Sequence, residues 1–173
     1  MTIEEAKRIY IKNGCSLFTM AREDADNYIL YKKLNIDSTI ENKWKKETME
    51  ALANCLKEKG DYTIYNRLYD LAIAFHDKER LELMIKSIDK VSVNNAKASL
   101  CIAETIMGRK NLSARSGMIF WAYDIGLINE ARILIQKVLS LVDVQTDNEE
   151  DKIRVSRDKK KIKEIIDYLK LKI

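Results

Sequence analysis

The chain has 173 residues, of which 46% are hydrophobic and 34% are charged, and its 31 basic and 27 acidic residues give a net charge of +4. This composition is that of a folded chain rather than a disordered one, and a charge so close to balance gives no general preference for nucleic acid. Three widely spaced cysteines and a single histidine argue against a disulfide framework and against a zinc site.

The chain contains no proline, the residue that most strongly ends helices, so other residues must mark the helix boundaries. Capping residues mark the starts of the first helices. Thr2 and Ser38 are each followed three residues later by a glutamate, which is the capping-box pattern at a helix N-terminus. These patterns predict helices over 3–13 and 39–59, with a third helix over 21–34 between them.

The remaining helices follow one another at short intervals. A strongly apolar segment over 62–75 predicts a central helix, since apolar side chains cover most of its circumference. Glycine and short polar residues mark the other boundaries. The predicted N-caps are Asp77, Ser92, Ser113 and Asn129, and the predicted helix ends are Gly14, Gly60, Gly108 and Gly126.

These elements predict an all-α fold of about eight or nine antiparallel helices, arranged either as a helical bundle or as a short array of α-hairpins. We expect a single helical domain over residues 1–143. Residues 144–161 are predicted to be a charged linker or the start of a helix, because they are mostly polar. Apolar spacing returns over 162–173, which predicts a C-terminal helix that docks on the same domain.

A shift of 51 residues aligns two helix–turn–helix segments with each other. The aligned pairs are Phe75 with Gly126, Arg80 with Ala131, Met84 with Ile135, Ile88 with Leu139 and Val91 with Val142. The second segment resembles the turn and second helix of tetratricopeptide-like α-hairpin repeats, over residues 112–143, and the first resembles it more faintly over 62–91. The resemblance implies a right-handed α–α superhelix that binds partner proteins, whereas generic antiparallel packing would use the same small residues.

The leading functional hypothesis is a protein–protein interaction module, with self-association into a homodimer as its simplest form. Aromatic residues exceed what one helix normally buries, and an exposed groove or a self-association face would use them. The predicted interaction surface consists of Tyr62, Tyr65, Tyr69, Phe120, Trp121 and Tyr123.

A second hypothesis is a small-molecule-binding or catalytic protein that uses the region 13–44. This region contains a non-periodic stretch in which Cys15 follows a glycine, where nearby amide dipoles would lower a thiol pKa. The predicted pocket consists of Cys15, Arg22, Tyr28, Tyr31 and Trp44. The alternative interpretation is a connecting loop that packs on the core.

A third hypothesis is nucleic-acid binding through the basic C-terminal segment, although the interleaved acidic residues favour an ordinary solvated helix face. Its cations are Lys152, Arg154, Arg157, Lys159, Lys160, Lys161 and Lys163. No catalytic, metal or cofactor motif is present, so we predict no cofactor and have no positive support for an enzyme. Without a secretory signal pattern or a long apolar run, we expect a cytoplasmic protein that makes no membrane contact.

Overall fold

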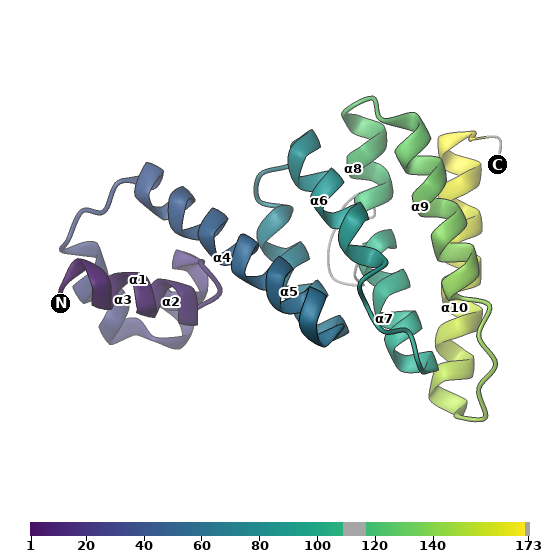
Figure 1. Ribbon diagram of the computed structural model, residues 1–173, viewed down its shortest axis with the longest axis horizontal. Coiled ribbons are helices and arrows are strands. Elements are labelled where there is room, and N and C mark those ends of the chain that lie inside the picture. Colours follow the sequence, from purple (N-terminus) through teal and green to yellow (C-terminus); the bar gives the residue numbers. More distant parts are fainter. Residues whose placement is uncertain (109–116, 172–173) are drawn as a thin grey trace. The chain divides into compact units, whose positions relative to one another are not determined.

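The computed structural model describes residues 1–108 and 117–171, and within these ranges the chain forms ten α-helices and no strand (Figure 1). The predicted all-α class is confirmed, with a helix count close to the eight or nine expected. The predicted N-cap Ser113, and residues 112–116 of the repeat-like segment, lie outside the described residues.

The helices group into two compact units, Met1–Cys55 and Leu56–Ile173. The boundary falls inside a single long helix, α4 (Ser38–Lys59). A boundary inside a helix leaves no glycine-rich or polar linker in the sequence, so composition gives no signal of it.

Unit 1 is built from three short helices and most of α4. These short helices are α1 (Ile3–Lys12), α2 (Leu17–Glu23) and α3 (Ala25–Lys32). Its core is aromatic: the Tyr10 ring stacks on Tyr31 at a centroid distance of 5.8 Å and lies 6.0 Å from Trp44. Met20 and Met49 are buried with these rings.

One of the two predicted capping boxes is present. The Thr2 hydroxyl accepts from the Glu5 amide, and the Glu5 carboxylate accepts from the Thr2 amide at 2.6 Å. The box predicted at Ser38 is wrong, because the Asp37 carboxylate accepts from the Thr39 amide instead. The single helix predicted over 21–34 is also divided, since Asp24 ends α2 and precedes α3.

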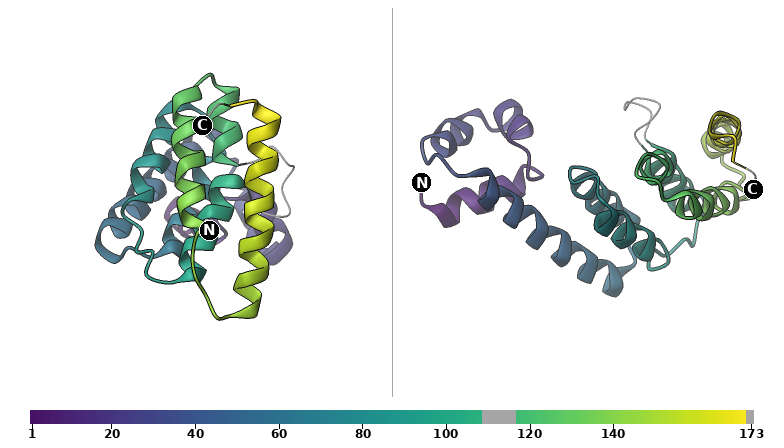
Figure 2. Two further views of the ribbon diagram at one scale, coloured as in Figure 1. Left: turned by 90° about the vertical axis from the view of Figure 1, so that its right-hand side faces the viewer. Right: turned by 90° about the horizontal axis from the view of Figure 1, so that it is seen from above.

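Unit 2 contains the end of α4 and six further helices that lie side by side (Figures 1 and 2). They are α5 (Tyr62–Ala72), α6 (Lys78–Ile88), α7 (Ala96–Met107), α8 (Met118–Asp124), α9 (Ile128–Leu141) and α10 (Glu149–Leu169). Helix α7 contacts α5, α8, α9 and α10, so α7 is the centre of the unit. Of residues 144–161, those from Glu149 onward belong to α10.

The caps of unit 2 agree with the prediction at Asp77 and differ at two other positions. Asp77 accepts from the Arg80 amide and begins α6. Helix α7 begins after Asn95, whose side chain accepts from the Ala98 amide, and not after Ser92. Helix α9 begins after Leu127 rather than Asn129, without a side-chain cap.

The hairpins α5–α6 and α8–α9 place their buried apolar residues in correspondence at a spacing of 50 residues, whereas the spacing of 51 brings the buried Arg80 and Ser87 onto the buried Ala131 and Val138. At the spacing of 51, the buried Ile88 falls on Leu139, which is 40% exposed. At 50, each buried apolar residue of α6 falls on a buried residue of α9, whereas the buried Arg80 and Ser87 fall on Glu130 and Lys137, which are only half-buried. The apolar pairs are Leu81 with Ala131, Met84 with Leu134 and Ile88 with Val138. The left-handed turn residues His76 and Gly126 are also 50 apart.

This register predicts different costs for two leucine substitutions on α9. Leu134 is fully buried, so Leu134→Ala should lower the free energy of unfolding by about 2–5 kcal/mol through lost burial and a cavity. Leu139→Ala should cost less than about 1 kcal/mol, because that side chain is 40% exposed. Urea denaturation of both variants measures the difference, and equal losses would contradict the register.

Candidate functional site

The predicted aromatic surface is for the most part the core of unit 2. Four of its six residues have at most 5% of their surface exposed, and these are Tyr65, Tyr69, Phe120 and Trp121. They point inward because each lies on the helix face that packs against neighbouring helices, as Tyr65 does when its hydroxyl donates to the Met84 carbonyl. Tyr62 is half-buried and Tyr123 is 38% exposed. These six residues therefore do not form a common exposed surface.

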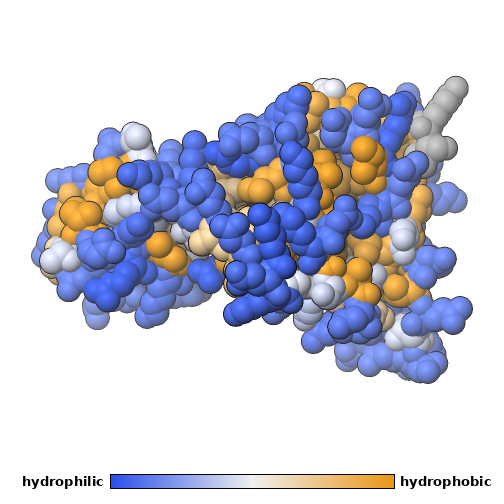
Figure 3. Space-filling model, viewed as in Figure 1, coloured by the Kyte–Doolittle hydropathy of each residue, from blue (hydrophilic) through white to orange (hydrophobic). Residues whose placement is uncertain are grey.

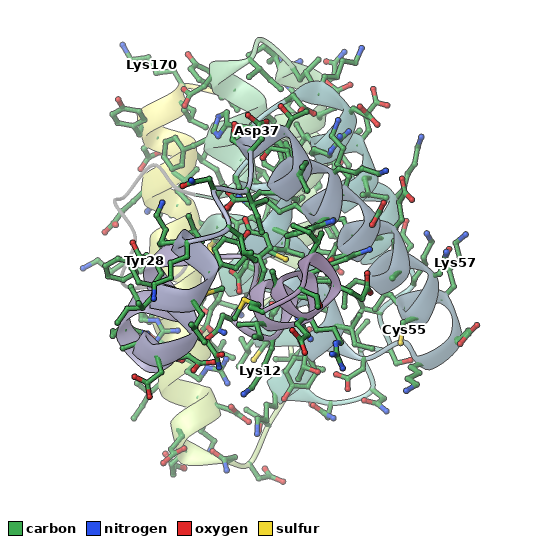
Figure 4. All side chains as sticks on the ribbon, turned by 90° about the vertical axis from the view of Figure 1, so that its left-hand side faces the viewer. Lys12, Tyr28, Asp37, Cys55, Lys57 and Lys170 are labelled. Atoms are coloured by element: carbon green, nitrogen blue, oxygen red, sulfur yellow. The ribbon has the colours of Figure 1, made fainter. Side chains whose placement is uncertain are left out.

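Three of the five residues of the predicted pocket do lie together, within the core of unit 1. Cys15, Tyr31 and Trp44 are each at most 5% exposed. Arg22 is exposed and lies over the Phe18 ring, with its guanidinium 5.7 Å from the ring centroid. Tyr28 is half-buried on α3 (Figure 4). The predicted pocket is therefore a filled core with two residues outside it.

The polar groups in this core contact one another and neighbouring residues. The Tyr31 hydroxyl donates to Glu41 at 3.0 Å, and burial followed by this hydrogen bond raises the Tyr31 pKa far above its ordinary value. Burial similarly raises the pKa of Tyr10. Cys15 has a left-handed φ of 55° and its Sγ lies 3.9 Å from Thr48 Oγ1. The interpretation of this region as a connecting loop is wrong from Leu17 onward, because Leu17–Glu23 form α2; Cys15 and Met20 do pack on the core, whereas Phe18 is 74% exposed.

The surface of unit 1 carries an open groove of about 440 Å³ between α1 and α3. Its lining residues are Met1, Glu5, Arg8, Ile9 and Lys12 on one side and Asn27 and Leu30 on the other. The first set recurs at intervals of three and four residues, which places it along one stripe. The three-residue interval from Asn27 to Leu30 does the same for α3. The sequence analysis did not predict this groove. The spacing of three and four residues was the one signal in the sequence that pointed to it.

The polar residues of the groove differ in how they are engaged. Glu5 belongs to the capping box, and the Thr2 backbone amide, followed by the Thr2 side chain, lowers its pKa. The Asn27 amide donates to Asp24 at 2.9 Å. The side chains of Arg8 and Lys12 are exposed and make no hydrogen bond or ion pair with any described residue, although the charge of Arg8 contributes to the lowered pKa of Glu5. Lys12 lies in the last turn of α1 (Figure 4).

The basic C-terminal segment is largely neutralised by acidic neighbours. Its cations form an ion pair or a hydrogen bond with a described residue at every position except Lys163. The partners are Glu149 for Lys152, Glu104 and Asp151 for Arg154, Glu104 and Asp158 for Arg157, Asp143 for Lys159, Glu164 for Lys160 and the Gly108 carbonyl for Lys161. A segment paired in this way presents little free positive charge to phosphates.

Part of this network lies between α7 and α10. Glu104 of α7 receives both Arg154, at 3.1 Å, and Arg157. Asp158 is 1% exposed, its Oδ1 accepts from Arg157 and its Oδ2 has no hydrogen-bond partner. Burial raises the Asp158 pKa, and Arg157 opposes this rise. The cations of α10 therefore attach this helix to α7.

Comparisons with known proteins give no family for the chain: no protein-family model matches it, and neither the curated proteins nor the solved structures provide a match. Within the part of the chain that the structure describes, every helix is too short or too polar to span a membrane. The same residues contain no cluster of three or more histidine, cysteine or acidic side chains arranged to hold a metal ion.

The burial of Cys15 predicts slow alkylation in the folded protein. Cys15 is 3% exposed, whereas Cys55 and Cys101 are half-buried. Mild treatment with iodoacetamide should modify Cys55 well before Cys15, because the reagent must reach the sulfur. Mass spectrometry of digests measures the order, and denaturant should remove it. Preferential labelling of Cys15 in the folded protein would contradict this expectation and would support the hypothesis of a reactive thiol at Cys15.

The ion pairs between α7 and α10 predict that removing the carboxylate of Glu104 costs more stability than removing an exposed carboxylate on α10. Glu104→Gln should lower the free energy of unfolding by about 1–2 kcal/mol, because two partly buried guanidinium groups lose the negative charge that they share. Glu164→Gln is the matched control, since its pair with Lys160 is 3.9 Å apart and exposed. The control should have no measurable effect in urea denaturation, and equal effects would contradict the assignment.

Proposed function

We propose that this chain is a protein-interaction module whose binding face is the groove between α1 and α3 of unit 1. The observation that carries the proposal is the groove itself, which is lined by both apolar and polar side chains. Interaction sites commonly have this composition, with an apolar centre and a polar rim.

Unit 1 is rich in exposed apolar residues, of which Leu30 lines the groove. Five of the eleven large apolar side chains exposed among the described residues belong to unit 1, which is less than a third of the chain. They are Ile3, Phe18, Ile29, Leu30 and Ile40. Figure 3 shows apolar surface at the N-terminal end of the chain, interrupted by hydrophilic side chains. Apolar surface of this kind favours contact with another protein over contact with water.

The partner class is another polypeptide rather than a small metabolite. The groove is open, and the polar side chains along it are mostly long and exposed instead of converging inside a cavity. Small-molecule sites usually enclose most of the ligand and fix it with a few convergent polar groups. An extended surface between two helices is better suited to an amphipathic segment.

A selection with displayed helical peptides tests this proposal directly. Peptides enriched on the full chain should bind Leu30→Glu at least ~10-fold more weakly, because a carboxylate would be buried at the centre of the contact. Ile133→Glu is the control, since Ile133 is 54% exposed on α9, outside the groove. Circular dichroism checks that both variants fold.

Two results would contradict the proposal. One is a selection that enriches no peptide above the level found with an unrelated protein. The other is equal weakening by Leu30→Glu and Ile133→Glu, which would place the contact outside the groove. Sedimentation velocity across the micromolar range tests the self-associating form, and Leu30→Glu should then convert a dimer to monomer.

A further inference from the structure

We infer that the groove between α1 and α3 selects an acidic amphipathic helix of a partner protein, which Arg8 and Lys12 recognise by charge. This inference rests on the proposed function, and it adds the chemistry of the partner. Three features of the groove support it: the apolar centre, the free cations and the length of the stripe.

The apolar centre determines which face of the partner docks. Ile9 is half-buried on α1 and Leu30 is 44% exposed on α3, and both line the groove. A docked helix would remove the rest of this apolar surface from water, which is the favourable term in such contacts. The partner must therefore present apolar side chains at intervals of three and four residues.

The cations determine the charge of the partner's flanking residues. Arg8 and Lys12 are four residues apart on α1, on the same stripe as Ile9, and no described carboxylate pairs with either. By contrast, the nearby Lys7 is occupied by Glu47 at 2.9 Å. Because neither cation forms an ion pair with a described carboxylate, a partner with carboxylates there gains attraction that a neutral or basic one lacks, and at Arg8 it adds to the weaker attraction of Glu5.

The one acidic residue of the groove limits where the partner's carboxylates can lie. Glu5 is held by the Thr2 cap at the start of α1, whereas Arg8 and Lys12 occupy its second half. Like charges would repel near Glu5, so the acidic residues of the partner belong beside Arg8 and Lys12. From Glu5 to Lys12 the stripe spans roughly 10 Å along the helix axis, which two turns of a partner helix would cover.

Three synthetic helical peptides of about 12 residues test the inference. They share one leucine face, and their flanking positions carry glutamate, glutamine or lysine. Fluorescence anisotropy with the full chain should give about fivefold tighter binding for the glutamate peptide than for the glutamine peptide, since two exposed charge pairs each contribute a few-fold. The lysine peptide should bind most weakly, and salt should reduce these differences.

The double substitution Arg8→Glu with Lys12→Glu should reverse the order of the glutamate and lysine peptides. Lys32→Glu with Lys33→Glu makes the same change in charge on exposed residues of unit 1 that do not line the groove, and it should retain the original order. Arg8→Gln with Lys12→Gln should abolish the preference, and this milder variant keeps the test valid if the reversed-charge variant fails to fold.

The outcomes separate the inference from the proposed function. Equal binding of all three peptides, weakened by Leu30→Glu, would overturn the acidic preference and leave the interaction module standing. No binding of any peptide, together with a failed display selection, would overturn both. A dimer in sedimentation that Leu30→Glu dissociates, with no peptide competing for it, would assign the groove to a second copy and overturn the partner inference.

Discussion

An amphipathic helix must cover its apolar face with a neighbour, and the two units of this chain meet that requirement to different extents. In unit 2, α7 is surrounded by α5, α8, α9 and α10, so its side chains are buried on almost every side. Unit 1 has only 55 residues, and a small unit buries a smaller fraction of its surface than a large one. Its core is completed by the rings of Tyr10, Tyr31 and Trp44, while the groove between α1 and α3 stays open. The proposed binding face is the consequence of that incomplete coverage.

The two units also differ in how their basic side chains are paired with carboxylates. On α10, the cations are used within the chain, because Glu104 and neighbouring carboxylates receive them and attach the helix to α7. On α1, Lys7 is paired with Glu47, whereas Arg8 and Lys12 have no carboxylate partner among the described residues. The seven cations of the C-terminal segment thus contribute mainly to internal packing. The two cations of the groove can contribute to recognition instead.

The sequence predicted local features well where neighbouring residues decide them. The Thr2 capping box, the Asp77 cap and the left-handed glycines all form as expected, because each depends on hydrogen bonds and sterics within a few residues. The aromatic surface was predicted less well. Periodicity identifies Tyr65 and Trp121 as members of an apolar face, but it cannot distinguish a face covered by another helix from one left exposed. Periodicity likewise cannot distinguish a pocket from a packed core. Three residues of the predicted pocket around Cys15 are buried together in the core of unit 1.

The sequence by itself determined the all-α class, most helix positions and the short turns between helices, since helical period and capping are local properties. Only the tertiary structure decided the boundary inside α4, the spacing of 50 between the two hairpins and the place of the groove. The physical reason is that burial depends on which helices become neighbours. Leu134 and Leu139 look alike in the sequence, but packing leaves one at 0% and the other at 40% exposure. The fold also brings Glu104 of α7 to Arg157, whereas it brings no carboxylate into an ion pair with Arg8 among the described residues.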